Sequence, residues 1–117
     1  MSEYTLHPRF PVATICGSMR RFDDQVKMWS AALTSAGYIV LAPFVCVAEG
    51  SRVKQMLDLM HRQKIDMADI VVVVDTDRYG EEVPEEEQYV GESTQGEINY
   101  AAKIGKGIFR ASDGWTP

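Results

Sequence analysis

The chain has 117 residues, of which 45% are hydrophobic and 25% are charged, and this balance is typical of one folded domain rather than of a disordered chain. Its formal net charge of -5 offers no basic field for DNA or RNA, so no nucleic-acid polymer is expected as a partner. No apolar run approaches the roughly 20 residues that cross a bilayer, and the beginning of the chain lacks the pattern of a signal peptide. We therefore expect a single cytoplasmic domain over residues 1–117 that does not contact a membrane.

The first half of the chain predicts strands and helices in alternation. Residues 11–18 form a short apolar run that stops at a glycine, which predicts a buried strand followed by a tight turn. Residues 23–37 repeat apolar side chains at helical spacing and end in a glycine, so a helix follows. Residues 38–45 predict a second buried strand, broken near Pro43. The next helix, over residues 51–68, has an apolar side made of Val53, Met56, Leu57, Met60, Ile65 and Ala68.

The second half repeats the alternation around one long loop. Residues 69–75 are almost continuously β-branched, which is typical of a strand covered on both faces of a parallel sheet. Residues 76–92 are rich in glutamate and form an unusually long connection, either a solvated surface excursion or a binding loop. A helix over about residues 94–105 and a short strand at 107–111 complete the chain. The pattern predicts an α/β fold, a three-layer doubly wound parallel sheet of the flavodoxin or Rossmann-like kind with four or five strands.

The sequence contains no recognisable metal or cofactor motif. Cys16 and Cys46 lie in apolar runs, and their spacing matches no zinc pattern, so both are expected to be reduced core thiols. A dinucleotide-binding glycine fingerprint and a P-loop are also absent. We expect neither a bound metal nor an organic cofactor.

Ligands of a doubly wound sheet bind beyond the carboxyl ends of the strands. A glycine there lets the backbone approach a ligand, an arginine can clamp an anion, and a helix N terminus offers free N–H groups with a partial positive charge. The sequence therefore predicts a pocket for a small phosphate or sugar. The segments expected to form it are the turn Gly17-Ser18-Met19-Arg20, residues 43–47 beginning with Pro43, and the helix mouth with Gly91, Ser93 and Thr94.

Glu97 has two interpretations that can both hold. The stretch from Thr94 to Glu97 fits a capping box, in which Thr94 accepts a hydrogen bond from the backbone of Glu97 and the carboxylate reaches back to the cap. An ionised carboxylate in a sugar-sized pocket can also attack an anomeric carbon and form a covalent glycosyl intermediate.

Two further side chains are candidates for catalysis beside Glu97. His61 lies toward the middle of the second helix, either as a surface or half-buried helix residue or as an acid for a departing base, since imidazole titrates near neutrality. Asp75 ends the third strand and is expected to face the same site.

Four stretches of the sequence resemble one known superfamily. They are ICGSMRRFDD, GYIVLAPFV, MHRQKIDMADIVVVVD and YVGESTQGEINYAAKIGKGI, which together reach from about residue 12 to residue 109. The chain resembles the nucleoside 2-deoxyribosyltransferase-like superfamily, which includes nucleoside and nucleotide N-glycosidases. The resemblance is strongest to a subgroup of small bacterial and phage proteins.

The resemblance implies roles for individual residues. The superfamily's nucleophilic glutamate falls on Glu97, and its strand-one turn, which touches the 5'-phosphate or sugar, falls on Gly17, Ser18 and Arg20. The small and hydroxyl residues that hold phosphate or ribose fall on Gly91, Ser93 and Thr94. Members form dimers or larger homo-oligomers, so a homodimer or a higher homo-oligomer is expected. The sequence departs from the superfamily at His61, where better characterised enzymes carry an aspartate.

The expected function is cleavage of the N-glycosidic bond of a nucleoside or nucleoside 5'-monophosphate, by hydrolysis or by transfer of the sugar. Glu97 would attack the anomeric carbon, and His61 or Asp75 would protonate or orient the base. The alternative is a catalytically silent protein of the same fold that binds a nucleoside or nucleotide as a sensor. Release of free base from a substrate panel distinguishes the two.

Overall fold

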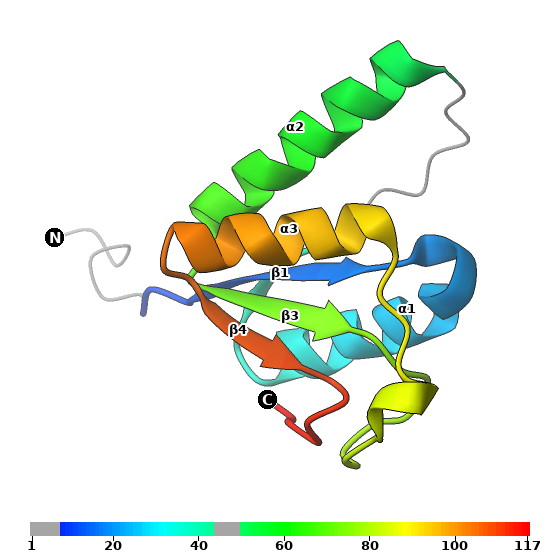
Figure 1. Cartoon of the computed structure of the whole chain (residues 1–117). Helices are drawn as coiled ribbons and strands as arrows, with labels where there is room; N and C mark the ends of the chain where they lie inside the picture. The colour runs from blue at the N-terminus through cyan, green and yellow to red at the C-terminus, as the bar shows by residue number, and fades with distance from the viewer. Residues whose placement is uncertain (1–7, 44–49) are drawn as a thin grey trace, which may run out of the picture.

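A four-stranded parallel sheet in the order β2-β1-β3-β4 forms the centre of the protein (Figure 1). The computed structural model describes residues 8–43 and 50–117, so Cys46 and most of the predicted 43–47 segment lie outside the described residues. The strands are β1 (Val12–Gly17), β2 (Ile39–Leu41), β3 (Ile70–Val74) and β4 (Gly107–Arg110). The helices are α1 (Met19–Ser35), α2 (Ser51–Met67), the short 3-10 helix η2 (Glu85–Glu87) and α3 (Glu92–Lys103).

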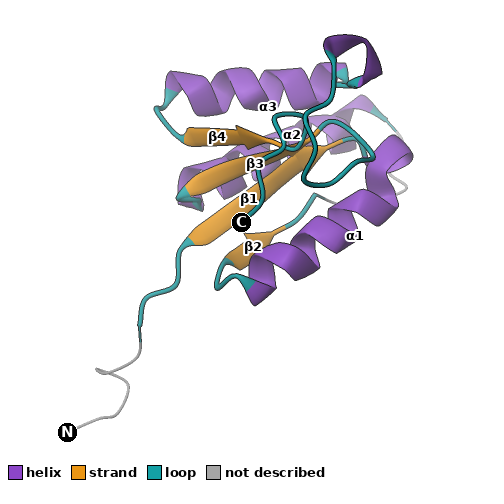
Figure 2. Cartoon of the chain, turned by 90° about the horizontal axis from the view of Figure 1, so that it is seen from below, coloured by secondary structure: helices purple, strands orange, loops and turns teal. Residues whose placement is uncertain are grey.

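Both faces of the sheet are covered by helices, which confirms the predicted three-layer α/β fold (Figure 2). Along β3, Val72 and Val74 pack in the core beneath α1, whereas Val71 and Val73 pack beneath α2 and α3. Successive side chains of a strand point to opposite faces. The continuous β-branched run of β3 therefore supplies both halves of the core at once.

The strand order reverses between β1 and β3. The chain passes from β1 outward to β2 and then returns to pair β3 on the other side of β1, in parallel register with Gly17 opposite Val74. Neighbouring crossovers then leave to opposite sides, which opens a crevice at the carboxyl ends of these two strands. Gly17 stands at this point of the fold.

Two predicted boundaries differ from the structure. Within the described part of the stretch expected as a strand, residues 38–43, the strand covers Ile39–Leu41, and it is not buried, since 52% of Ile39 is exposed. The reason is position: among the strands of residues 8–43 and 50–117, β2 pairs with β1 alone and lies at the edge of the sheet. Helix α1 begins at Met19, so Arg20 lies in its first turn rather than in a loop.

Helix α2 is only half covered. Ile65 and Ala68 are buried as predicted, but 53% of Met56 and 41% of Met60 are exposed. The N-terminal part of α2 extends past the sheet (Figure 1). The homodimer stays a prediction.

Within residues 8–43 and 50–117, no helix has the length and apolar character needed to span a bilayer.

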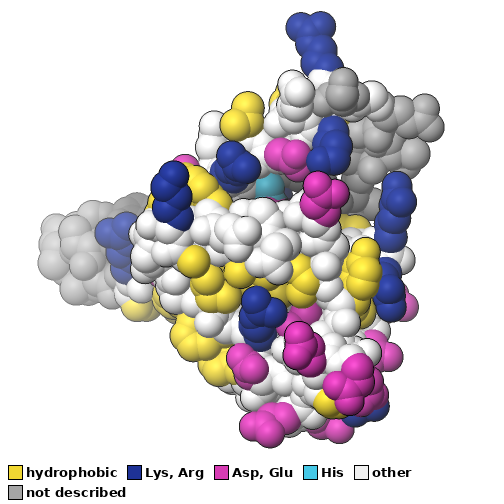
Figure 3. Space-filling view, in the orientation of Figure 1, with side chains coloured by type: hydrophobic (Ala, Val, Ile, Leu, Met, Phe, Trp, Pro, Cys, Tyr) yellow, Lys and Arg dark blue, Asp and Glu magenta, His cyan; other side chains and the backbone are white. Residues whose placement is uncertain are grey.

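The acidic 76–92 loop is tied to the C-terminal segment. The backbone N–H of Val83 donates to the carbonyl oxygen of Ser112 at 2.8 Å, and Val83 is itself buried. Arg78 pairs with Glu87 at 2.8 Å. Acidic side chains gather at this end of the molecule, away from the hollow between α2 and α3 (Figure 3).

We expect Gly17→Ala to destabilise the fold and Gly96→Ala to stabilise it. A Cβ on Gly17 would lie 2.9 Å from the carbonyl oxygen of Val74, whereas a Cβ on Gly96 meets nothing within 4 Å. The first change forces β1 from β3 at a cost of about 1–3 kcal/mol, and the second favours the helix by about 0.5–1 kcal/mol. Urea unfolding measures both, and an unchanged midpoint for Gly17→Ala would contradict the close approach.

Candidate active site

Two helix N termini without side-chain caps meet at one hollow. Ser18 precedes α1 and Gly91 precedes α3, and neither helix has a side-chain cap hydrogen bond. Unpaired N–H groups and the helix dipole favour an anion at such positions. The hollow, of about 380 Å³, is lined by Gly17, Ser18, Met19, Arg20, Tyr89, Gly91, Glu92, Ser93, Thr94 and Glu97.

The predicted capping box is wrong. Helix α3 begins at Glu92 with Gly91 as its N-cap, so Thr94 lies inside the first turn and Glu97 in the second. Thr94 is buried and Glu97 is too far along the helix to reach back to the cap. Glu97 therefore does not have the helix-capping role that its sequence context indicated.

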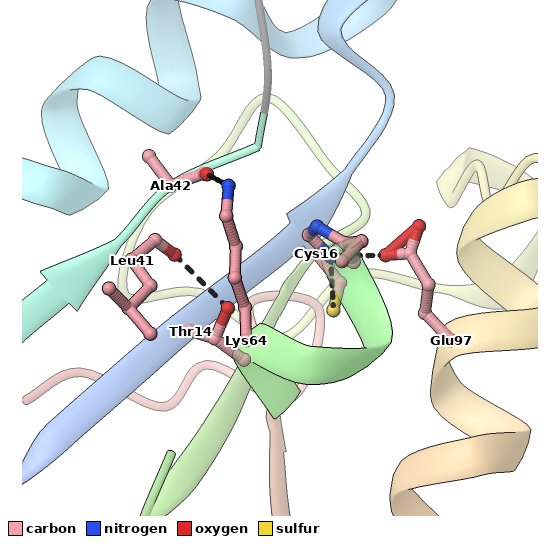
Figure 4. A network of polar contacts seen from close by, with 7 residues as sticks. Thr14, Cys16, Leu41, Ala42, Lys64 and Glu97 are labelled. Atoms are coloured by element: carbon pink, nitrogen blue, oxygen red, sulfur yellow. Dashed lines mark hydrogen bonds and ion pairs between the residues drawn. The ribbon is translucent and has the colours of Figure 1, made fainter. Parts of the chain in front are cut away.

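Glu97 points inward and meets two side chains from other layers (Figure 4). Its Oε2 lies 2.5 Å from His61 Nε2, and the side chains are 18% and 7% exposed. The same ring nitrogen lies 3.5 Å from Cys16 Sγ on β1. Glu97 Oε2 is buried and lies close to the imidazole, but no donor meets it in hydrogen-bond geometry. Cys16 Sγ, His61 Nε2 and Glu97 Oε2 therefore lie close together without a well-aligned hydrogen bond to the carboxylate.

This environment shifts two pKa values. Burial raises the pKa of the Cys16 thiol well above 9.0, and the nearby negative charge of Glu97 raises it further. Partial burial lowers the pKa of Lys64 from 10.5, while Glu97 acts in the opposite direction. Lys64 donates from Nζ to the carbonyl oxygen of Ala42 at 2.6 Å. Cys16 is therefore a neutral thiol at neutral pH rather than a nucleophilic thiolate.

A second hollow, of about 370 Å³, lies between α2 and α3 and shares Glu97, Glu92 and Ser93 with the first. Figure 3 shows acidic and basic side chains gathered on this face of the molecule. Its other lining residues are Lys54, Asp58, Arg62 and Gly96. Sequence reasoning missed the three α2 residues, although their spacing of four places them on one polar face of the helix.

Sequence reasoning also missed Tyr89, whose contact with Arg21 distinguishes the roles of Arg20 and Arg21. The Arg21 guanidinium lies 4.1 Å above the centre of the Tyr89 ring, a cation–π contact. Arg20 is exposed and lines the hollow at the two helix ends. Arg20 is therefore the arginine of this pair that can face an anion there.

The structure does not bring every predicted residue to the hollows. His61 contacts Glu97 but is not among the lining residues of either hollow. Asp75 is fully buried and accepts hydrogen bonds from the backbone and hydroxyl of Ser112 at 2.9 and 2.6 Å, with Arg110 at 3.7 Å. It anchors the C-terminal segment instead of facing the site. Pro43 lines neither hollow, and residues 44–47 lie outside the described part of the chain.

Comparison with known proteins supports the fold. No family model matches the sequence, and no curated protein matches it. One similar solved structure is a 2-desoxiribosyltransferase from Leishmania mexicana, with a TM-score of 0.58 and 17% sequence identity. The match covers 86% of this chain and 63% of that chain, so the protein spans less than two thirds of the neighbour's length. At this identity the likeness establishes a shared fold.

The raised pKa of Cys16 predicts a loss of stability at high pH. In the unfolded chain the thiol ionises near a pKa of about 8.5, whereas the folded protein resists ionisation. The stability that the protonated Cys16 thiol contributes is fully present below the pKa of the unfolded chain and is lost as the pH rises above that pKa. The free energy of unfolding of the wild type should fall relative to Cys16→Ala by up to about 1.4 kcal/mol per pH unit between about pH 8.5 and 10.

Urea unfolding under reducing conditions measures this difference. Cys46 is present in both proteins, so its ionisation in the unfolded state is common to the two curves. Parallel stability curves across this pH range would show that the folded protein does not disfavour the Cys16 thiolate.

Proposed function

We propose that the protein cleaves the N-glycosidic bond of a nucleoside or a nucleoside 5'-monophosphate, with Glu97 as nucleophile. The observation that carries this proposal is the position of Glu97, an inward-facing carboxylate shared by two hollows beside two uncapped helix N termini. Each hollow falls within the range of small-molecule sites, about 300–1,000 Å³. The shared fold with a 2-desoxiribosyltransferase supports the same chemistry.

The proposed reaction proceeds in two steps. A Glu97 carboxylate oxygen forms a bond to the anomeric carbon as the bond from that carbon to the base breaks, and the base leaves with the electron pair. The base takes up a proton from solvent as it leaves. Water, or the nitrogen of a second base, then bonds to the anomeric carbon as the bond from that carbon to the Glu97 oxygen breaks, and it loses a proton to solvent. This step restores the carboxylate and gives the free sugar or a new nucleoside.

We assign His61 a positioning role in this reaction rather than direct protonation of the base. Its Nε2 approaches Glu97 Oε2 to 2.5 Å, its side chain is only 7% exposed, and the ring lines neither hollow. An imidazole held in this way directs one carboxylate oxygen and leaves the other to face the substrate. Asp75 has no part in the proposed reaction.

The two helix ends support a phosphate group on the substrate. The backbone at Ser18 and Gly91, together with the exposed Arg20, gathers N–H donors and positive charge in one hollow. Glu92 also lines this hollow and opposes an anion there. A 5'-monophosphate bound at the helix ends leaves its sugar in reach of Glu97, which lines the same hollow.

Glu97→Gln should abolish base release, whereas Glu92→Gln should not. Both glutamates belong to α3 and line both hollows, but only Glu97 contacts His61. An amide cannot attack the sugar, so we expect kcat to fall more than about 10³-fold for Glu97→Gln and less than about tenfold for Glu92→Gln. Chromatography of free base from nucleosides and 5'-monophosphates measures this, with EDTA in the buffer.

An inactive wild type that binds one member of the panel saturably would replace this proposal by the silent binding protein. Equal loss of activity in the two glutamate variants would remove Glu97 from its assigned role. Circular dichroism of each variant verifies that the fold is retained.

Arg20→Gln should weaken binding of monophosphates selectively. Loss of one charge-assisted contact raises KM for a 5'-monophosphate about tenfold or more and changes KM for the corresponding nucleoside less than about twofold. Arg21→Gln is the matched control, because its guanidinium stacks on Tyr89. Steady-state kinetics on the substrate pair measures the ratio, and an equal effect of both substitutions would contradict a phosphate contact at Arg20.

A further inference from the structure

Three side chains with metal-binding atoms converge between the sheet and helices α2 and α3. Cys16 Sγ, His61 Nε2 and a Glu97 carboxylate oxygen all lie within 4.8 Å of one another. The thiol and the carboxylate both approach the same ring nitrogen, at 3.5 and 2.5 Å. A single imidazole nitrogen carries one proton or one lone pair, so it cannot form a good hydrogen bond with both partners at once.

We propose that Cys16, His61 and Glu97 form a binding site for a divalent transition-metal ion of the zinc class. Sulfur, imidazole nitrogen and carboxylate oxygen are the three ligand types that zinc takes in proteins. The ion would displace the proton of the Cys16 thiol into solvent, and the resulting thiolate favours such an ion over magnesium or calcium, which take oxygen ligands. Three protein ligands leave a fourth coordination position for water or a substrate atom.

The separation of the ligand atoms suits this ion. In tetrahedral coordination, a sulfur bound at about 2.3 Å and a nitrogen bound at about 2.0–2.1 Å lie about 3.5 Å apart, and Cys16 Sγ and His61 Nε2 are 3.5 Å apart. Nitrogen and oxygen ligands of the same ion lie about 3.3 Å apart, so the carboxylate must withdraw from its 2.5 Å contact. Glu97 can do so by side-chain rotation, since it borders two hollows.

Burial makes the cluster unusual as a metal-free arrangement. Cys16 is fully buried, 6% of His61 is exposed, and the buried Oε2 of Glu97 has no hydrogen-bond partner. Packing accounts for Cys16 alone, because it belongs to the apolar cluster beneath α2 and α3. A cation would satisfy the carboxylate oxygen, the imidazole and the sulfur together, and it would reach them from the hollows past Glu97.

The site has a consequence for the proposed function. An ion bound to the Glu97 oxygen beside His61 would withdraw negative charge from the whole carboxylate and make its other oxygen a weaker nucleophile. Zinc would therefore inhibit base release, and a chelator would restore it. This consequence rests on the proposed function, whereas the binding of the ion does not. An experiment can therefore show that the ion does not bind, or that the protein does not release base, independently of each other.

The binding test uses the whole chain, stripped of metal and titrated with Zn²⁺ against a chromogenic chelator, and with Co²⁺ by absorption spectroscopy. We expect one ion per chain and a thiolate-to-cobalt charge-transfer band. Cys16→Ser should abolish the band and weaken zinc binding at least about 100-fold. Cys46→Ser and His7→Gln change the only other cysteine and histidine of the chain and should leave both readouts unchanged.

Three results would overturn the site: no zinc bound in competition with the chelator, a charge-transfer band that persists in Cys16→Ser, or a loss in Cys46→Ser equal to that in Cys16→Ser. Circular dichroism verifies the fold of each variant. If Cys16→Ser does not fold, Cys16→Ala takes its place. The wild-type cobalt spectrum compared with that of Cys46→Ser then still decides whether Cys16 binds the ion.

Discussion

The close pairing of β1 with β3 is the constraint on which the rest of the structure depends. Gly17 lies against the carbonyl of Val74, where a side chain would not fit. The pairing puts two central strands side by side with their carboxyl ends level. It therefore brings the turn before α1 and the connection that leads to α3 to one place, although these segments are far apart in the sequence. Both hollows adjoin α3, and the hollow at the helix N termini also borders Gly17 at the carboxyl end of β1.

A polar contact inside an otherwise apolar layer marks the site. Val71, Val73, Ile65 and Ile98 surround Cys16 beneath the helices, as expected of a doubly wound core. His61 and Glu97 interrupt this layer with a mostly buried imidazole and carboxylate. Buried ionisable groups cost stability unless they are paired, so their presence here indicates a use beyond packing. The proposed nucleophilic attack and the proposed ion binding are two such uses of the same carboxylate.

The charges around the site divide into separate roles. Helix N termini and Arg20 favour an anion in one hollow, while Lys54, Asp58 and Arg62 give the other hollow a mixed polar wall. The remaining acidic side chains of the 76–92 loop gather elsewhere, where Arg78 offsets one of them (Figure 3). A chain with a net charge of -5 can therefore still offer a local site for a small anion.

The sequence by itself determined the kind and order of the elements, because apolar periodicity and glycine stops act over a few neighbouring residues. It also predicted that residues far apart in the chain meet at one edge of the sheet, since the carboxyl ends of parallel strands lie together. These residues include Gly17, Arg20, Ser93 and Glu97, which line one hollow. The tertiary structure alone decided that β2 is an exposed edge and that Asp75 anchors Ser112. It also decided that Cys16 meets His61 and Glu97. Those outcomes depend on which elements become neighbours in space, and no local pattern of side chains carries that information.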